Sequence, residues 1–152
     1  MNYGTLPSRF LHAVTELPNP RAQMIRRDGA WQSVSSQEFL RRVAGLSQAF
    51  AELGVKTGDR VGLFAPNCPE WHTADFAITG IGAVTVPVYF NESPDRMAYI
   101  LKHSQAKVVF VCAATQLHKP LAIRAQLPQL QQIIAAEAGE SLPADCLRFE
   151  TL

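Results

Sequence analysis

The stretch that decides the fold runs from Gly54 to Phe90 and reads GVKTGDRVGLFAPNCPEWHTADFAITGIGAVTVPVYF. After turn residues, the short apolar run at 60–65 has the length of a buried strand. Two prolines end that strand, and residues 70–81 carry apolar side chains at helical spacing. The β-branched run at 83–89 predicts a second strand. A strand, a helix and a strand in this order predict a right-handed parallel βαβ unit.

The pattern continues toward the C-terminus. Ser93-Pro94 is typical of a helix start, and KVVFVC at 107–112 predicts a third buried strand. A further helix is expected over 115–125, where Pro120 either kinks the helix or marks its true start. Residues 132–134 predict a fourth strand.

The expected strands begin near residues 60, 84, 108 and 132, each 24 residues after the one before. This spacing accommodates a strand, a loop, a helix of about three turns and a second loop. It predicts an α/β fold with three layers, α/β/α, and a mainly parallel sheet.

Before this region, residues 5–17 have the pattern of a helix. Asp28-Gly29 separates two short strand-like runs and predicts a hairpin, which we expect to pair at an edge of the sheet. Ser35 and Glu38 form a capping-box pattern at the start of the next helix, and Gly54 ends it.

The length of 152 residues suits one domain. Within it we expect a helix and hairpin at 1–34, an α/β core at 35–138 and a linker at 139–152, where the periodic pattern ends.

Charge and composition exclude several classes of protein. Lys and Arg number 14 against 13 Asp and Glu, so no basic surface for nucleic acid is expected. The three cysteines lie in unrelated contexts and predict no disulfide framework. The N-terminus lacks the pattern of a signal peptide, and no apolar run approaches the roughly 20 residues that span a bilayer. We therefore expect a cytoplasmic protein without a transmembrane segment.

Few residues suggest chemistry. Cys68 and His72 are four residues apart, as in a metal-binding pair, but a site would need further ligands, and no second pair has suitable spacing. Cys112 ends a strand, where open α/β sheets place ligands, and is a weak candidate nucleophile. Trp71 is either a core residue or a wall of a hydrophobic tunnel, and the sequence does not separate the two.

Other polar residues have structural explanations. Carboxylates in turns and at helix starts need no catalytic role: Asp59, Glu70, Asp75 and Asp95. Single histidines are expected to be exposed or locally hydrogen-bonded: His12, His103 and His118. Gly80-Ile81-Gly82 precedes a strand instead of following one, which argues against a nucleotide-binding fingerprint.

Three segments carry a resemblance to a known family: GVKTGDRVGLFAPNCPEW, GAVTVPVY and PVYFNESPDRMAYILKHSQAKVVFV. Together they resemble the N-terminal part of the adenylate-forming acyl-CoA synthetases, and most of all the bacterial long-chain fatty acid–CoA ligases. The resemblance covers roughly residues 31–134. One departure is Cys68, where the family usually has a serine that caps the helix; cysteine is a poorer acceptor for the exposed N–H groups.

The resemblance implies a two-step reaction in the full-length enzyme. ATP activates a carboxylate as an acyl-adenylate and releases pyrophosphate, and the thiol of CoA then displaces AMP. The family uses a Ser/Thr/Gly-rich loop, Mg²⁺ and a lysine from a mobile C-terminal domain for this chemistry. No such motif occurs in this sequence, so we assign no catalytic, cofactor-binding or metal-binding residue; ATP, Mg²⁺ and CoA belong to the full-length parent.

We therefore expect an N-terminal fragment of a long-chain fatty acid–CoA ligase that is inactive alone. Its partners would be the rest of the ligase chain and, in the whole enzyme, a fatty acid; the parent could be peripheral to the inner membrane. A sheet that is part of a larger domain would expose an unpaired strand edge in the isolated fragment, so we expect homo-oligomers. The alternatives are a stand-alone interaction or dimerisation module, an α/β domain that binds a small molecule, and a ligase for medium-chain or aryl acids.

Overall fold

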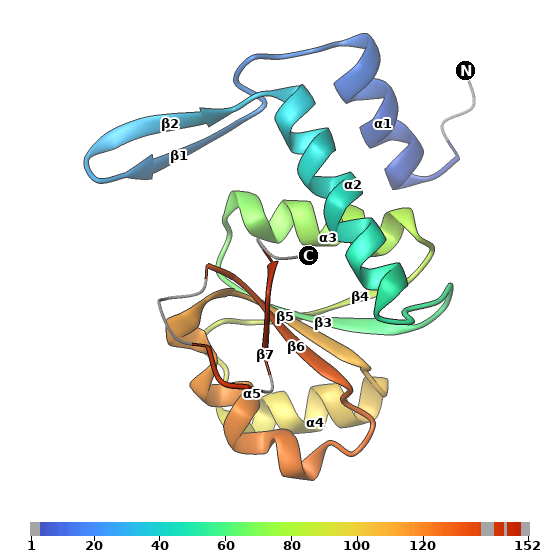
Figure 1. The fold of residues 1–152 in the computed structure, drawn as a ribbon, viewed down its shortest axis with the longest axis vertical. Helices are drawn as coiled ribbons and strands as arrows, with labels where there is room; N and C mark the ends of the chain where they lie inside the picture. Colours follow the sequence, from blue (N-terminus) through green and yellow to red (C-terminus); the bar gives the residue numbers. More distant parts are fainter. Residues whose placement is uncertain (1–3, 138–141, 145, 150–152) are drawn as a thin grey trace.

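The computed structural model describes residues 4–137, 142–144 and 146–149. Within these residues, five strands form one parallel sheet in the order β4-β3-β5-β6-β7. Figure 1 shows helices α2 and α3 on one face of the sheet and α4 and α5 on the other. The predicted three-layer α/β/α fold is therefore confirmed. The strands of this sheet are β3 Arg60–Phe64, β4 Val84–Val88, β5 Val108–Ala113, β6 Gln132–Glu137 and β7 Cys146–Arg148.

Helices α3, α4 and α5 alternate with strands β3 to β6 along the chain, and α1 and α2 precede them. The helices are α1 Leu6–Glu16, α2 Ser36–Glu52, α3 Pro69–Gly80, α4 Pro94–Ser104 and α5 His118–Ile123. The helix expected over 115–125 is in fact a short α-helix flanked by two 3₁₀ turns, η1 Ala114–Gln116 and η2 Arg124–Gln126. Pro120 lies in the first turn of α5, where its missing N–H has no helical partner to lose. The proline thus marks the start of a helix.

Both faces of the sheet are buried at its central strands β3 and β5, as a parallel sheet requires. Alternate residues of β5 enter different cores: Val108, Phe110 and Cys112 lie in the cluster under α2 and α3, whereas Val109 and Val111 lie in the cluster over α4 and α5. This is why the strand reads as a continuous apolar run and not as an alternating one.

Helix α2 forms as its pattern predicts. The Ser35 side chain accepts a hydrogen bond from the backbone N–H of Glu38, which is one half of the expected capping box. The Glu38 carboxylate accepts hydrogen bonds from Arg41 and Arg42 instead. Gly54 has a φ of 80°, the left-handed conformation that ends a helix. The inward residues are buried: Phe39, Val43, Leu46 and Phe50. Helix α1 packs on α2 and α3 through Phe10, whose ring stacks on Phe76 at 4.2 Å between centroids.

The hairpin forms where Asp28-Gly29 predicts it, with φ values of 51° and 80° at the two turn residues. Strands β1 (Gln23–Arg27) and β2 (Ala30–Val34) pair antiparallel. The expectation that the hairpin pairs at an edge of the main sheet is wrong: among the described residues it forms a two-stranded sheet of its own. It is held instead by packing on α3 and by an ion pair between Arg27 and Glu70 at 2.9 Å.

Strand β7 was not predicted, because the sequence from residue 139 onward has no strand-length apolar run. Strand β7 has only three residues, and it is recognised as a strand by its pairing with β6. Residues 138–141 and 145 lie outside the described residues, so the division at 138/139 stays a prediction. In the part of the chain that the structure describes, no helix has the length and apolar character needed to cross a membrane.

The close approach of α4 to β3 depends on Gly62. A Cβ at this position would lie 2.6 Å from Cδ2 of Leu101 and 3.1 Å from Cγ2 of Val109. We expect Gly62→Ala to lower the free energy of unfolding by about 1–3 kcal/mol, because both neighbours are fully buried and the core must shift. Urea denaturation of the chain measures the change.

Gly45→Ala is the matched control. Gly45 is an exposed residue inside α2, and nothing lies within 4 Å of a Cβ added there. This variant should gain about 0.5–1 kcal/mol, since alanine loses less conformational entropy in a helix. Equal effects of the two substitutions would contradict the packing described at Gly62.

Candidate functional site

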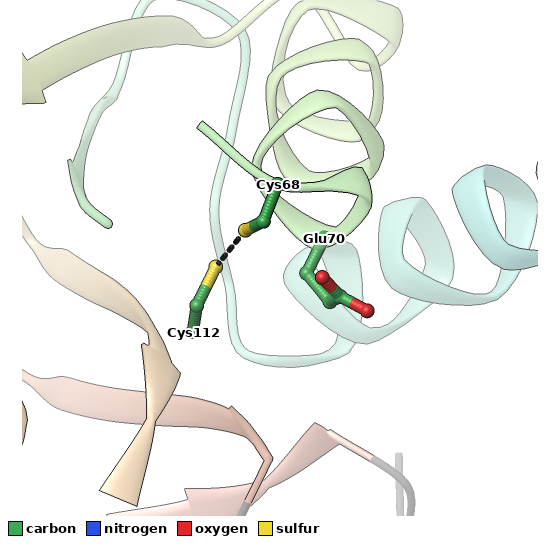
Figure 2. A group of neighbouring side chains, drawn as sticks. All are labelled: Cys68, Glu70 and Cys112. Carbon is green, nitrogen blue, oxygen red and sulfur yellow. Dashed lines mark hydrogen bonds between the residues drawn. The ribbon is translucent and has the colours of Figure 1, made fainter. Parts of the chain in front are cut away.

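Two cysteines meet at the carboxyl edge of the sheet. Cys68 precedes the first turn of α3, and Cys112 lies near the end of β5. Figure 2 shows their sulfur atoms pointing toward each other. The two Sγ atoms lie 2.9 Å apart. The contact joins residues 44 positions apart in the chain. It arises because β3 and β5 are neighbouring parallel strands, so the corner after β3 and the end of β5 reach the same edge.

The two thiols differ in environment. Cys112 is 6% exposed in the cluster under α2 and α3, whereas Cys68 is half-buried. The hydrogen bond with Cys112 holds the pKa of the Cys68 thiol below its ordinary value, against the opposing effects of burial and of the nearby Glu70 carboxylate. Cys68 makes no side-chain cap to α3, in line with its expected weakness as an acceptor. Cys68 is therefore the more accessible thiol of the pair, and its pKa is lowered.

Glu70 is the third member of this cluster. Its carboxylate and the two sulfur atoms each lie within 4.8 Å of one another, so these three residues could supply ligands to a metal ion. The carboxylate also accepts a hydrogen bond from Arg27 of the hairpin. The sequence did not suggest this group, because its members come from a corner, a helix turn and a distant strand. Only the order of the strands brings them together.

A pocket of about 390 Å³ opens beside Cys68, between the hairpin and the starts of α2 and α3. Its lining includes residues of β1, the corner after β3 and the inner side of α3: Ala22, Gln23, Met24, Ile25, Phe39, Asn67, Cys68, Pro69, His72 and Phe76. Cys68 thus borders this pocket, whereas Cys112 does not line it.

His72 does not join Cys68 in the metal-binding pair that the spacing suggested. Its Nδ1 lies 3.0 Å from the backbone carbonyl oxygen of Cys68, and its ring meets that of Trp71 edge to face. Trp71 itself is half-buried and packs against the cluster under α2 and α3. The sulfur partner of Cys68 is Cys112, the residue singled out as a weak nucleophile.

The candidate carboxylates hold the fold together. Asp59 pairs with Lys107 at 2.8 Å, and this partner lowers the pKa of the Asp59 carboxyl below its ordinary value. The side chain of Asp75 accepts a hydrogen bond from the hydroxyl of Thr85, which links α3 to β4. Asp95 lies in the first turn of α4, where the helix dipole favours a negative charge.

The remaining candidates have local roles. His103 stacks on Tyr99, and Nδ1 of His118 lies 2.7 Å from the carbonyl oxygen of Thr115. His12 lies half-buried on α1. Gly82 has a φ of 76° and sits against Thr57, so it serves the turn between α3 and β4.

The class of protein follows from this architecture. Solved adenylate-forming ligases share the fold: the anthranilate CoA ligase AuaEII in complex with anthranoyl-AMP superposes with a TM-score of 0.82 and 25% identity, over 93% of this chain and 26% of that one. An acetoacetyl-CoA synthetase from Streptomyces lividans superposes with a TM-score of 0.82 and 24% identity, over 96% of this chain and 24% of the other. The chain has the fold of the N-terminal part of these enzymes.

The family is shown by sequence. The model of the family described as "AMP-binding enzyme" matches residues 10–151, and the chain belongs to this family. A long-chain-fatty-acid–CoA ligase, FadD15 of Mycobacterium bovis, is 34% identical over 109 residues, which are 70% of this chain and 18% of the relative. The peroxisomal long chain acyl-CoA synthetase 7 of Arabidopsis thaliana is 30% identical over 149 residues, 93% of this chain and 21% of the relative. The chain spans about a fifth of the length of these relatives.

The lowered pKa of Cys68 predicts its reactivity. We expect iodoacetamide to alkylate Cys68 before Cys112 and Cys146, which are both buried. Because the thiolate is the nucleophile and the pKa is lowered, the rate should rise at a lower pH than for an unperturbed thiol. Mass spectrometry of timed, quenched samples across a pH series measures both properties.

Cys112→Ala tests the cause of this shift. The variant removes the hydrogen bond that stabilises the Cys68 thiolate, so the pH profile of alkylation should move upward. If alkylation of Cys68 in the wild-type protein became fast only at the same pH as an unperturbed thiol, or at a higher pH, the assigned environment would be contradicted.

Proposed function

We propose that this chain is the N-terminal portion of an ATP-dependent long-chain fatty acid–CoA ligase. The observation that carries the proposal is the family match over residues 10–151, together with curated relatives named as long-chain ligases. The share of those relatives that the chain spans, 18–21%, supports its being one part of a larger enzyme.

In the proposed parent, a fatty acid carboxylate is adenylated by ATP with release of pyrophosphate, and CoA then displaces AMP to give acyl-CoA. The role of this chain in that reaction is structural. Its buried β3 and β5 carry the corner loops of one sheet edge, and ion pairs such as Lys107–Asp59 tie successive units together. The rest of the ligase chain, its partner in this proposal, would supply the groups that contact ATP, Mg²⁺ and CoA, and the 152-residue chain alone would be inactive.

An exposed edge supports the proposal that more protein packs here. Strand β4 ends the strand order, and Pro87 within it is tolerated because an edge strand needs fewer ladder hydrogen bonds. Large apolar side chains on and after this strand are exposed: Val84 by 48%, Tyr89 by 76% and Phe90 by 52%. In the parent the rest of the ligase would cover this edge. Self-association of the isolated chain and a stand-alone dimerisation module are the alternatives that the same surface supports.

The test is acyl-CoA formation by the full-length parent. Purified protein is incubated with ATP, Mg²⁺, CoA and palmitate, and AMP and palmitoyl-CoA are quantified by chromatography. We expect both products in equal amounts, and neither from the 152-residue chain at the same concentration. After cell fractionation, we expect this activity in the cytoplasmic fraction, or with the inner membrane if the parent is peripheral to it.

The choice of acid distinguishes a long-chain ligase from a ligase for medium-chain or aryl acids. Octanoate and benzoate are run as parallel substrates, and a ligase for medium-chain or aryl acids would prefer one of them to palmitate. If none of the three acids gave acyl-CoA, the proposal would be contradicted.

A further inference from the structure

We infer that Cys68 and Cys112 are a redox modification site, at which the two thiols form a reversible disulfide that links the start of α3 to the end of β5. The Sγ atoms already lie 2.9 Å apart, and Figure 2 shows them directed at each other from different elements. The two sulfur atoms need to approach by less than about 1 Å to form an S–S bond of about 2.05 Å.

The geometry favours a disulfide over a metal ion. Two sulfur ligands on one tetrahedral zinc, with Zn–S bonds of about 2.3 Å, lie roughly 3.8 Å apart. The observed separation of 2.9 Å is too short for that arrangement. Glu70, the third residue near the sulfur atoms, has its carboxylate engaged by Arg27 at 2.9 Å. The carboxylate therefore already has a cationic partner.

The two cysteines have the unequal environments of an attacking and a resolving thiol. Cys68 is half-buried and lines the pocket of about 390 Å³, so a small oxidant reaches it first. The lowered pKa of its thiol increases the thiolate fraction at neutral pH. Cys112 is buried directly behind Cys68 and is 6% exposed, which places it within reach of Cys68 but not of solvent.

The oxidant belongs to the class of small-molecule disulfides, such as oxidised glutathione. The Cys68 thiolate attacks one sulfur, forms a mixed disulfide and releases one equivalent of the small thiol. The Cys112 thiolate then attacks Sγ of Cys68, which forms the Cys68–Cys112 bond and releases the second equivalent. The protein loses two protons and two electrons, and these reduce the small disulfide to two thiols.

The bond would close a loop that contains α3, β4 and α4. Cross-linking residues 44 positions apart restricts the unfolded chain more than the folded one, whose two sulfur atoms are already in contact. The oxidised protein should therefore melt at a higher temperature than the reduced protein, and a reductant such as dithiothreitol should reverse the rise.

The sequence allows a direct test by peptide mapping. Trypsin places the three cysteines in separate peptides, 61–96, 108–124 and 125–148, because cleavage does not occur between Lys119 and Pro120. The reduced 152-residue chain is treated with oxidised glutathione, blocked with iodoacetamide and digested without reductant. We expect peptides 61–96 and 108–124 joined, an intact mass lower by two hydrogens before blocking, and a single alkylated cysteine in 125–148.

Two variants serve as controls. Cys146→Ser should keep the linked peptides, and Cys112→Ser should stop at a glutathione adduct on Cys68. If Cys112→Ser does not fold, the peptide map of the oxidised wild-type chain still tests the inference. Three alkylated cysteines after oxidation, or linkage through Cys146, would overturn the inference. So would stoichiometric zinc, bound by the untreated protein and protecting both thiols from alkylation.

Discussion

The fold depends on the burial of β3 between two parallel neighbours. Arg60–Phe64 pairs with β4 on one side and with β5 on the other, and its apolar residues enter both cores. Parallel neighbours cannot be joined by a hairpin, so each connection must cross a face of the sheet, and a helix is the usual way to do so. Helix α3 therefore covers one face and α4 the other, and Gly62 gives α4 the space to lie close.

The same constraint creates the candidate site. Parallel strands end at a common edge, and the chain must turn there into each crossover helix. The corner after β3 carries Cys68, and the end of β5 carries Cys112, so a contact between distant residues follows from strand order alone. The hairpin closes this corner from outside through the Arg27–Glu70 ion pair, and it forms one wall of the adjacent pocket.

Most of the fold could be predicted from sequence because its signals are local. The 24-residue spacing placed the starts of four strands correctly, and Ser35 and Gly54 marked the ends of α2. The errors concern features decided by tertiary contacts. The hairpin packs on α3 instead of the sheet edge, and the three residues of β7 have no pattern apart from their pairing with β6. The contact of Cys68 with Cys112 could not be predicted, because it requires knowing that β5 lies beside β3.

The chain belongs to the AMP-binding enzyme family, and several of its polar residues and glycines serve the fold. Its candidate carboxylates are engaged in pairs or helix starts, Gly54 and Gly82 serve turns, and Gly62 serves close packing. We propose that this framework belongs to a larger ligase. The most direct measurement is the reading frame of the source DNA beyond codon 152. The account predicts an open frame that soon encodes a Thr/Ser/Gly-rich loop ending in Pro-Lys-Gly; a stop codon immediately after Leu152 would contradict it.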